Sequence, residues 1–324
     1  MTIAELLHVP VLLAPMEDVT DIAFRRACRT VGADVCVTEF VHADHMIAGS
    51  KTAQRKATLV ADDRPTAIQI YGADPARLLA AARIAEAAAP AFVDINCGCW
   101  IPKIAKAGAG AGWLRDPIAM IEMARAIAAE VSLPVTVKTR IGWGPESDMP
   151  IVDLARRLED VGVAALTIHC RTALAGHSGP ADWTWARRAR EAVAIPVIVN
   201  GDVRTADDVV RALDETGCAA AMIGRGAIDH PWVFREARAA LAIRAGSSDA
   251  AHREILAGPT DDERRAMFAL LTDANVAQRG ERVGIGVTRR HVGVLGPLAT
   301  ALRPRLFAAR SRTEVHDVLG VAAA

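Results

Sequence analysis

Residues 195–227, IPVIVNGDVRTADDVVRALDETGCAAAMIGRGA, contain a complete strand–helix–strand unit. The apolar runs at 196–201 and 219–225 lack the polar–apolar alternation of a half-exposed strand, so we expect two strands that are buried on both faces. The stretch between them opens on Thr205 and closes on Gly217, which are typical of the start and the end of a helix. Two parallel strands joined through a helix are the repeating unit of α/β folds.

The same unit repeats along the first two thirds of the chain. Six further apolar runs precede it, with helical stretches between them: PVLLAP (10–15), ADVCVTEF (33–40), TAIQIY (66–71), AFVDINC (91–97), PVTVKTR (134–140) and AALTIHC (164–170). Eight strands that alternate with helices predict a (β/α)8 TIM barrel. A doubly wound open sheet uses the same units, but the count of eight favours the barrel.

The chain changes character after the eighth run. From about residue 243 the sequence is helical and rich in arginine, which predicts a barrel domain over 1–242 and a small helical domain over 243–324. The stretch 279–312 holds eight arginines and one acidic residue, Glu281, although the whole chain has a net charge of zero. Such a basic surface favours nucleic-acid binding, with a solvated helix face as the ordinary alternative.

The composition is that of a globular chain: 324 residues, of which 52% are hydrophobic. No apolar stretch approaches the roughly 20 residues that cross a bilayer, and the first residues lack a basic signal-peptide region, so we expect a cytoplasmic protein without a membrane partner. Six cysteines at irregular spacing indicate reduced thiols. No second Cys or His pair completes a ligand set with Cys97 and Cys99, so no metal is expected.

In a TIM barrel, the residues that end the strands form a ring around one pocket. Here the ring is polar: Met16, Glu17, Asp18, Glu39, Gln69, Asn96, Cys99, Lys138, Arg140, His169, Arg171, Asn200, Asp202, Gly224 and Arg225. The last two runs end in NGDV (200–203) and IGRGA (223–227), where small residues let a ligand approach the backbone and Arg225 can bind oxygen atoms. These positions predict a phosphate site, although each is also an ordinary tight turn.

Lys138 and Arg140 lie two residues apart in an extended run, so both can face the pocket. Buried positive charge favours an electron-rich or anionic group there, such as a flavin; an ion pair with Glu39 or another acid is the alternative. Gln69 is then expected at the pyrimidine edge of the flavin ring, and His169 at the ring or its phosphate.

Cys99 lies in the segment NCGCWIPKIAKAGAGAGWLRDP (96–117). A cysteine thiol is mostly protonated at neutral pH and can act as a general acid. Cys97, nearer the strand, is expected to be a buried apolar side chain, with a redox dithiol as the alternative. The residues KIAKAGAGAG (103–112) are expected to be too glycine-rich for a stable helix and to form a mobile cover that carries Lys103 and Lys106, or else a surface linker.

Several segments resemble, in order, the tRNA-dihydrouridine synthases, in particular their DusB-like branch. They are APMEDVTDIAFRRACRTVGAD (14–34), PTAIQIYGADP (65–75), VDINCGCWIPKIAKAGAGAGWLRDP (93–117), LPVTVKTRIGW (133–143), IHCRTALAGHSGPADW (168–183), IPVIVNGDV (195–203) and AAMIGRGAIDHPWVF (220–234). The resemblance is dense over about residues 10–240 and weak beyond them.

The resemblance implies an FMN-dependent enzyme that reduces a specific uridine of tRNA to 5,6-dihydrouridine, with NADPH as reductant. Hydride would pass from flavin N5 to uracil C6, and Cys99 would give a proton to C5. The implied FMN contacts are Pro15, Met16, Gln69, Lys138, His169, Asn200, Gly201, Asp202, Gly224 and Arg225. The implied contacts with the uracil or the tRNA are Asn96, Arg140, Arg171, Lys103, Lys106, Arg289 and Arg290. We expect the protein to act as a monomer.

One departure from the family follows Cys99 directly, where the family has proline and this chain has Trp100. The backbone at Cys99 is freer without the proline. The indole is expected to cover the loop, with stacking on a nucleobase as the alternative. Three other functions stay open: an FMN-dependent oxidoreductase of small pyrimidines, a non-catalytic RNA-binding regulator, and a lyase that uses Lys138 as a Schiff base.

Overall fold

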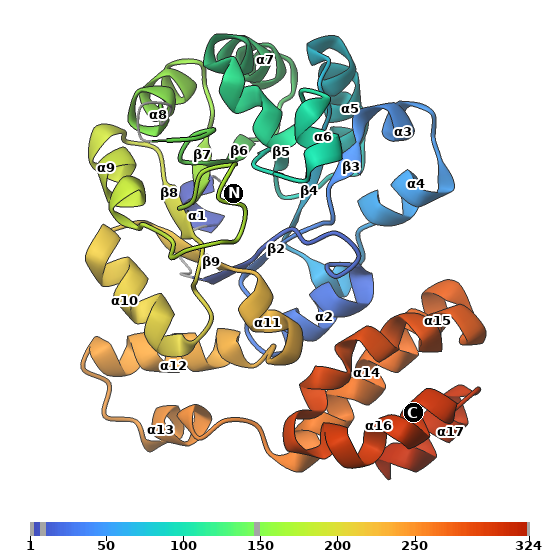
Figure 1. Cartoon of the computed structure of the whole chain (residues 1–324). Coiled ribbons are helices and arrows are strands. Elements are labelled where there is room, and N and C mark those ends of the chain that lie inside the picture. Colours follow the sequence, from blue (N-terminus) through green and yellow to red (C-terminus); the bar gives the residue numbers. More distant parts are fainter. Residues whose placement is uncertain (1–2, 7–10, 146–149, 323–324) are drawn as a thin grey trace.

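A parallel barrel of eight strands forms the centre of the computed structural model, which describes residues 3–6, 11–145 and 150–322 (Figure 1). The barrel strands are β1 (Val11–Leu13), β2 (Val35–Val37), β4 (Thr66–Tyr71), β5 (Val93–Cys97), β6 (Val135–Arg140), β7 (Ala165–His169), β8 (Val197–Asn200) and β9 (Ala220–Ile223). β1 pairs with both β2 and β9, and β2 pairs with β4, which closes the circle. The predicted (β/α)8 TIM barrel is confirmed.

Helices surround the barrel (Figure 1). They are α2 (Ile22–Thr30), α3 (Ala43–Ile47), α4 (Lys51–Ala57), α5 (Pro75–Ala87), α7 (Pro117–Glu130), α8 (Ile151–Asp160), α9 (Thr184–Ala192), α10 (Ala206–Thr216), α11 (Arg225–Asp229) and α12 (Val233–Arg244). The two-residue strand β3 (Val41–His42) pairs with the end of β4. α10 has the predicted boundaries, because the Thr205 side chain accepts from the Asp208 N–H and Gly217 ends the helix with a left-handed φ of 63°.

Polar and apolar residues do not alternate along the strands because both faces of each strand are buried. Leu12, Val35 and Ile198 belong to an apolar cluster that also contains Ile3 and Leu6 of the short helix α1 (Ile3–Leu6). Leu13 and Ile68 belong to a second, larger cluster between the strands and the surrounding helices. An apolar run is therefore the sequence pattern that a TIM-barrel strand requires.

The C-terminal helices form a separate layer beside α2 and α12 (Figure 1). They are α13 (Ala250–Leu256), α14 (Asp261–Arg279), α15 (Glu281–Thr288), α16 (Ala299–Ala308) and α17 (Arg312–Leu319), with the 3₁₀ segment η4 (Arg289–Leu298). They have an apolar core of their own, which includes Phe268, Leu295 and Leu306. The domain boundary expected between residues 242 and 243 lies inside α12, and the division into two domains stays a prediction.

Ion pairs and ring contacts join these helices to the barrel, and two of them lie at or near α2. The guanidinium of Arg279 lies 2.8 Å from a carboxylate oxygen of Asp21, and both side chains are largely buried. The imidazole ring of His291 stacks on Phe24 of α2, with 4.9 Å between the ring centroids. None of the helices in the described ranges is long and apolar enough to cross a membrane.

The segment 103–112 differs from its expectation. It contains the helix α6 (Pro102–Lys106) and enters the 3₁₀ segment η2 (Gly110–Arg115), so the expectation that it is too glycine-rich for a helix is wrong. Its glycines permit close packing: a Cβ on Gly110 would lie 2.7 Å from the Cys99 carbonyl oxygen, and one on Gly112 would lie 2.6 Å from that of Ala105. Residues 109–114 are buried, which a mobile cover would not be.

Substitution of two glycines of α15 tests whether close backbone packing stabilises the C-terminal helices. A Cβ on Gly284 would lie 2.6 Å from the Val276 backbone of α14, whereas a Cβ on Gly286 would meet open space. We expect Gly284→Ala to lower the free energy of unfolding by about 1–3 kcal/mol, because the helices must separate. Gly286→Ala should be neutral or stabilise by up to about 1 kcal/mol. Urea unfolding of both variants measures this, and equal stability would contradict the packing role of Gly284.

Candidate functional site

A cavity of about 340 Å³ opens at the carboxyl-terminal ends of the barrel strands. Cys99 lines it, together with nine of the ten residues expected to bind a cofactor: Pro15, Met16, Lys138, His169, Asn200, Gly201, Asp202, Gly224 and Arg225. The cavity has the size of a small-molecule site, and its polar groups converge from six barrel strands and the loops that follow them. The barrel thus brings together residues that lie more than 200 positions apart in the sequence.

Gln69, the tenth expected cofactor residue, lies in a polar layer outside the cavity lining. Its side chain is fully buried; Nε2 donates to Asp94 Oδ2 at 2.6 Å, and Oε1 accepts from Asn96 Nδ2 at 2.8 Å. Asp94 also accepts from Thr136, and burial raises the pKa of its carboxyl to about 6. We missed Asp94 in the sequence, although its position two residues before Asn96 in a strand places both side chains on one face.

Lys138 carries a positive charge on a half-buried side chain. Its Nζ donates to Asn200 Oδ1 at 3.1 Å, and no carboxylate of the described residues forms an ion pair with it. Burial and the charge of Arg140 together lower the pKa of the ammonium to about 8, although the charge of Asp94 acts in the opposite direction. The alternative of an ion pair with Glu39 does not hold, because Glu39 pairs with Lys56 at 3.8 Å.

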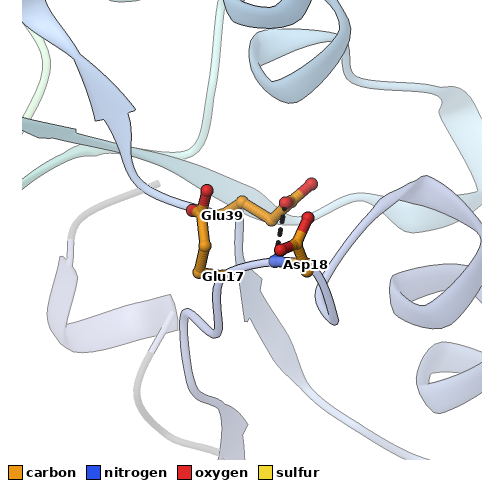
Figure 2. A group of neighbouring side chains, drawn as sticks. All are labelled: Glu17, Asp18 and Glu39. Carbon is orange, nitrogen blue, oxygen red and sulfur yellow. Dashed lines mark hydrogen bonds between the residues drawn. The ribbon is translucent and has the colours of Figure 1, made fainter. Parts of the chain in front are cut away.

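Three acidic side chains lie close together (Figure 2), and one of them, Glu17, lines the cavity. Carboxylate oxygens of Glu17, Asp18 and Glu39 lie within 4.8 Å of one another, and the Asp18 N–H donates to Glu39 Oε1 at 2.9 Å. Burial raises the pKa of Glu39. The ammonium of Lys56 pairs with both Glu17 and Glu39, so the cluster already has a counter-charge supplied by the chain.

The loop after β5 holds Cys99 by its backbone. Asn96 Oδ1 accepts from the N–H groups of Gly98 and Cys99, at 3.1 and 2.9 Å. The Cys99 carbonyl accepts from the Ala111 N–H at 2.9 Å. Burial raises the pKa of the Cys99 thiol, whereas the charges of Arg140 and Lys138 lower it. The net rise keeps the thiol protonated at neutral pH, which is the form that a proton donor needs.

Cys97 is a fully buried side chain of the core, as expected. All six cysteines are free thiols, and Cys99 is the one that is not buried. The six cysteines form no disulfide with one another in the described residues, and their reduced state stays a prediction.

Arg140 and Arg171, expected to contact a substrate, are buried and bind the chain itself. Arg140 donates to the carbonyl oxygens of Gly98, Thr172 and Gly176, at 2.8–2.9 Å. Arg171 donates to the Gly179 carbonyl and pairs with Asp202. Neither guanidinium lines the cavity within the described ranges. The two arginines fix the loops after β5 and β7, and their contact with a substrate stays a prediction.

Two histidines line the cavity beside this loop. Burial and the charges of Arg140 and Lys138 lower the pKa of His169 strongly, so its ring is neutral. His177 lies 5.7 Å from His169 between ring centroids, and burial together with Arg225 lowers its pKa to about 4. We missed His177, which the sequence marks only by its place in the loop after β7.

The loops after β8 and β9 meet at the end where a phosphate was expected. Asp202 Oδ1 lies 3.4 Å from the guanidinium of Arg204 and 3.7 Å from that of Arg225. A Cβ on Gly226 would lie 2.6 Å from the Arg204 backbone, so this contact requires glycine. Arg204 also lines the cavity and is a cationic residue that sequence reasoning missed.

The other expected substrate residues lie away from the cavity. Lys103 and Lys106 are exposed on α6. Arg290 is exposed on η4, whereas Arg289 is half-buried, donates to the Ala309 carbonyl and lies over the Phe307 ring. Any contact of these four residues with a nucleic acid stays a prediction.

Known proteins resemble this chain over most of its length. A probable tRNA-dihydrouridine synthase of Rhodobacter capsulatus is 34% identical over 296 residues, which cover 91% of this chain and 88% of that protein. The tRNA-dihydrouridine synthase B of Pseudomonas aeruginosa is 33% identical over 282 residues, which cover 87% of this chain and 82% of that protein.

Among solved structures, the 6-hydroxypseudooxynicotine amine oxidase of Pseudomonas geniculata N1 matches 74% of this chain and 50% of its own, with a TM-score of 0.56. At 13% identity this likeness concerns the barrel fold alone. Residues 12–259 match the family described as dihydrouridine synthase (Dus). The chain therefore belongs to the dihydrouridine synthase family and is an oxidoreductase with tRNA-dihydrouridine synthase activity.

Proposed function

We propose that the cavity binds FMN, that NADPH is the reductant, and that Cys99 donates the proton that completes the reduction of a tRNA uridine. Relatives named synthase B support a place in the DusB-like branch. The single observation that carries the cofactor proposal is the half-buried ammonium of Lys138, which lines the cavity and forms no ion pair with a carboxylate of the described residues. Such a charge is costly unless an electron-rich or anionic group lies beside it.

The other cavity residues fit the same ligand. Lys138 suits an electron-rich ring at the deep end, and Arg204 and Arg225 suit a phosphate at the end formed by β8 and β9. FMN held by these residues would supply the hydride that reduces the uracil ring. Cys99 would then give its proton to C5, and the raised pKa keeps that proton on the thiol until it is needed.

The uridine must leave the folded tRNA to reach Cys99, which costs a few kcal/mol of unstacking. Phosphate contacts elsewhere offset this cost. Of the eight arginines in 279–312, five are exposed: Arg282, Arg290, Arg303, Arg305 and Arg310. Arg282, Arg289 and Arg310 line a cavity of about 520 Å³, which supports a phosphate-binding surface on the C-terminal helices.

Replacement of Cys99 tests the proton donor. Cys99→Ala should lower dihydrouridine formation on unmodified tRNA by about 100- to 10,000-fold, the usual contribution of a general acid. Cys97→Ala removes a buried thiol two residues away and should keep the activity. Nucleoside mass spectrometry after incubation with NADPH measures the product. Equal activity of Cys99→Ala and the native chain would refute the assignment. A native, FMN-containing protein that reduces free pyrimidines but no tRNA would favour a small-pyrimidine oxidoreductase.

Lys138 gives a prediction about pH. With a pKa of about 8 in the free protein, its charged form is lost as the pH rises through 8. The affinity for FMN should therefore fall above this pH, by up to about tenfold per pH unit, because binding then takes up a proton. Lys138→Met should bind FMN more weakly and lose this slope. Flavin fluorescence titrations from about pH 7 to pH 9 measure it, and equal slopes in both proteins would rule out this role of Lys138.

The arginine surface predicts the salt dependence of tRNA binding. Arg282→Gln combined with Arg310→Gln should weaken binding and reduce the slope of log K against log salt by about one unit for each lost phosphate contact. Arg125→Gln on α7, an exposed arginine that pairs with Glu122, is the matched control. Filter binding over a series of salt concentrations measures both slopes. An unchanged slope in the double variant would place the tRNA elsewhere.

A further inference from the structure

The indole of Trp100, the residue after Cys99, packs against the loop that follows β7. A Cβ placed on Gly176 would lie 3.0–3.2 Å from three carbons of the indole, so the ring rests directly on the glycine backbone. Gly176 also has a left-handed φ of 57°, which favours glycine there for a second reason. The imidazole of His177 makes an edge contact with the indole, at 5.6 Å between centroids and 83° between planes.

Arg140 joins the same two loops through their backbones. Its Nε donates to the Gly98 carbonyl at 2.8 Å, and its Nη1 donates to the Gly176 carbonyl at 2.8 Å. Cys99 lies between Gly98 and Trp100 in the sequence. Arg140 links the Gly98 carbonyl to the Gly176 carbonyl, and the Trp100 indole packs against Gly176. The backbone of Cys99 is therefore fixed on both sides, on one side by a guanidinium and on the other by an indole.

We propose that Trp100 is a positioning residue for Cys99, which holds the thiol in the cavity by tying the loop after β5 to the loop after β7. The benzene part of the indole faces Gly176, so the chain itself occupies that face. Trp100 stays 37% exposed and contributes little to the core, which suits a contact between loops. This inference rests on the proposed role of Cys99 as proton donor.

Alkylation by iodoacetamide tests the position of the thiol without any turnover. The other five cysteines are buried, so modification of the native protein reports on Cys99, and peptide mass spectrometry confirms the site. In Trp100→Ala the loop is released and the thiol gains contact with water, so its pKa should fall. A fall of one pKa unit gives about tenfold more thiolate at a fixed pH, and the alkylation profile should move to lower pH accordingly.

Steady-state kinetics on tRNA separate positioning from binding. Trp100→Ala should lower kcat by about 10- to 100-fold with little change in KM, because the proton donor is misplaced while the tRNA contacts remain. Trp100→Phe keeps an aromatic ring and should recover most of the rate. Gly176→Ala, whose Cβ would displace the indole, should reproduce the effects of Trp100→Ala. Trp185→Ala is the matched control, since that half-buried indole lies on α9 and lines no part of the cavity.

An alkylation profile of Trp100→Ala that coincides with the native one would overturn the proposal. A raised KM with an unchanged kcat would also overturn it, and would indicate that the indole stacks on a nucleobase instead. His177→Ala removes the edge contact of the indole, and its alkylation profile provides the same test if Trp100→Ala does not fold. Full activity in Cys99→Ala would refute the proton donor itself, an outcome that the alkylation profiles distinguish from a failure of Trp100 to position the loop.

Discussion

The cavity depends on the amine of Lys138, which is half-buried and forms no ion pair with an acid of the described residues. Lys138 is held by the amide of Asn200, and the acid closest in the polar layer, Asp94, is bound to Gln69 and Thr136. The loss of hydration destabilises an ammonium group in this position, and no ion pair offsets that loss. A ligand with excess electron density stabilises the charged amine. Positive charge in the same site also disfavours the protonation of nearby imidazoles. His169 is accordingly neutral, and burial together with Lys138 and Arg140 keeps it so.

The sequence was sufficient for the barrel and for most of the cavity lining. A strand of a TIM barrel ends where its loop begins, so the residues at the ends of eight apolar runs had to meet at one face. Lys138, Asn200 and Arg225 lie where this rule places them. The same rule does not predict how far below the cavity a side chain lies. It therefore does not distinguish Gln69 and Asn96, which lie in a buried layer, from residues that line the cavity.

Two kinds of contact were hidden from the sequence. Arg140 and Arg171 bind backbone carbonyl groups, and no side-chain pattern marks a carbonyl as a partner. The glycines at 110 and 112 were interpreted as a source of mobility, whereas they allow two backbones to approach closely. A mobile loop and a closely packed segment can have the same glycine content. They differ in the atoms that a Cβ on each glycine would meet. His177 was missed for a similar reason, since its partner Trp100 comes from another loop.

The close packing of Gly110 and Gly112 bears on which partner, the protein or the RNA, changes conformation on binding. The segment that carries Cys99 is already folded against its own backbone, so little conformational entropy is left to lose when the substrate binds. The enzyme side of the complex is preorganised. On the proposed mechanism the rearrangement would fall on the tRNA, whose nucleotide would be extruded into a site that is already shaped. Uridines in loosely stacked regions of a tRNA lose least stacking energy in that movement, so a preorganised site would favour them.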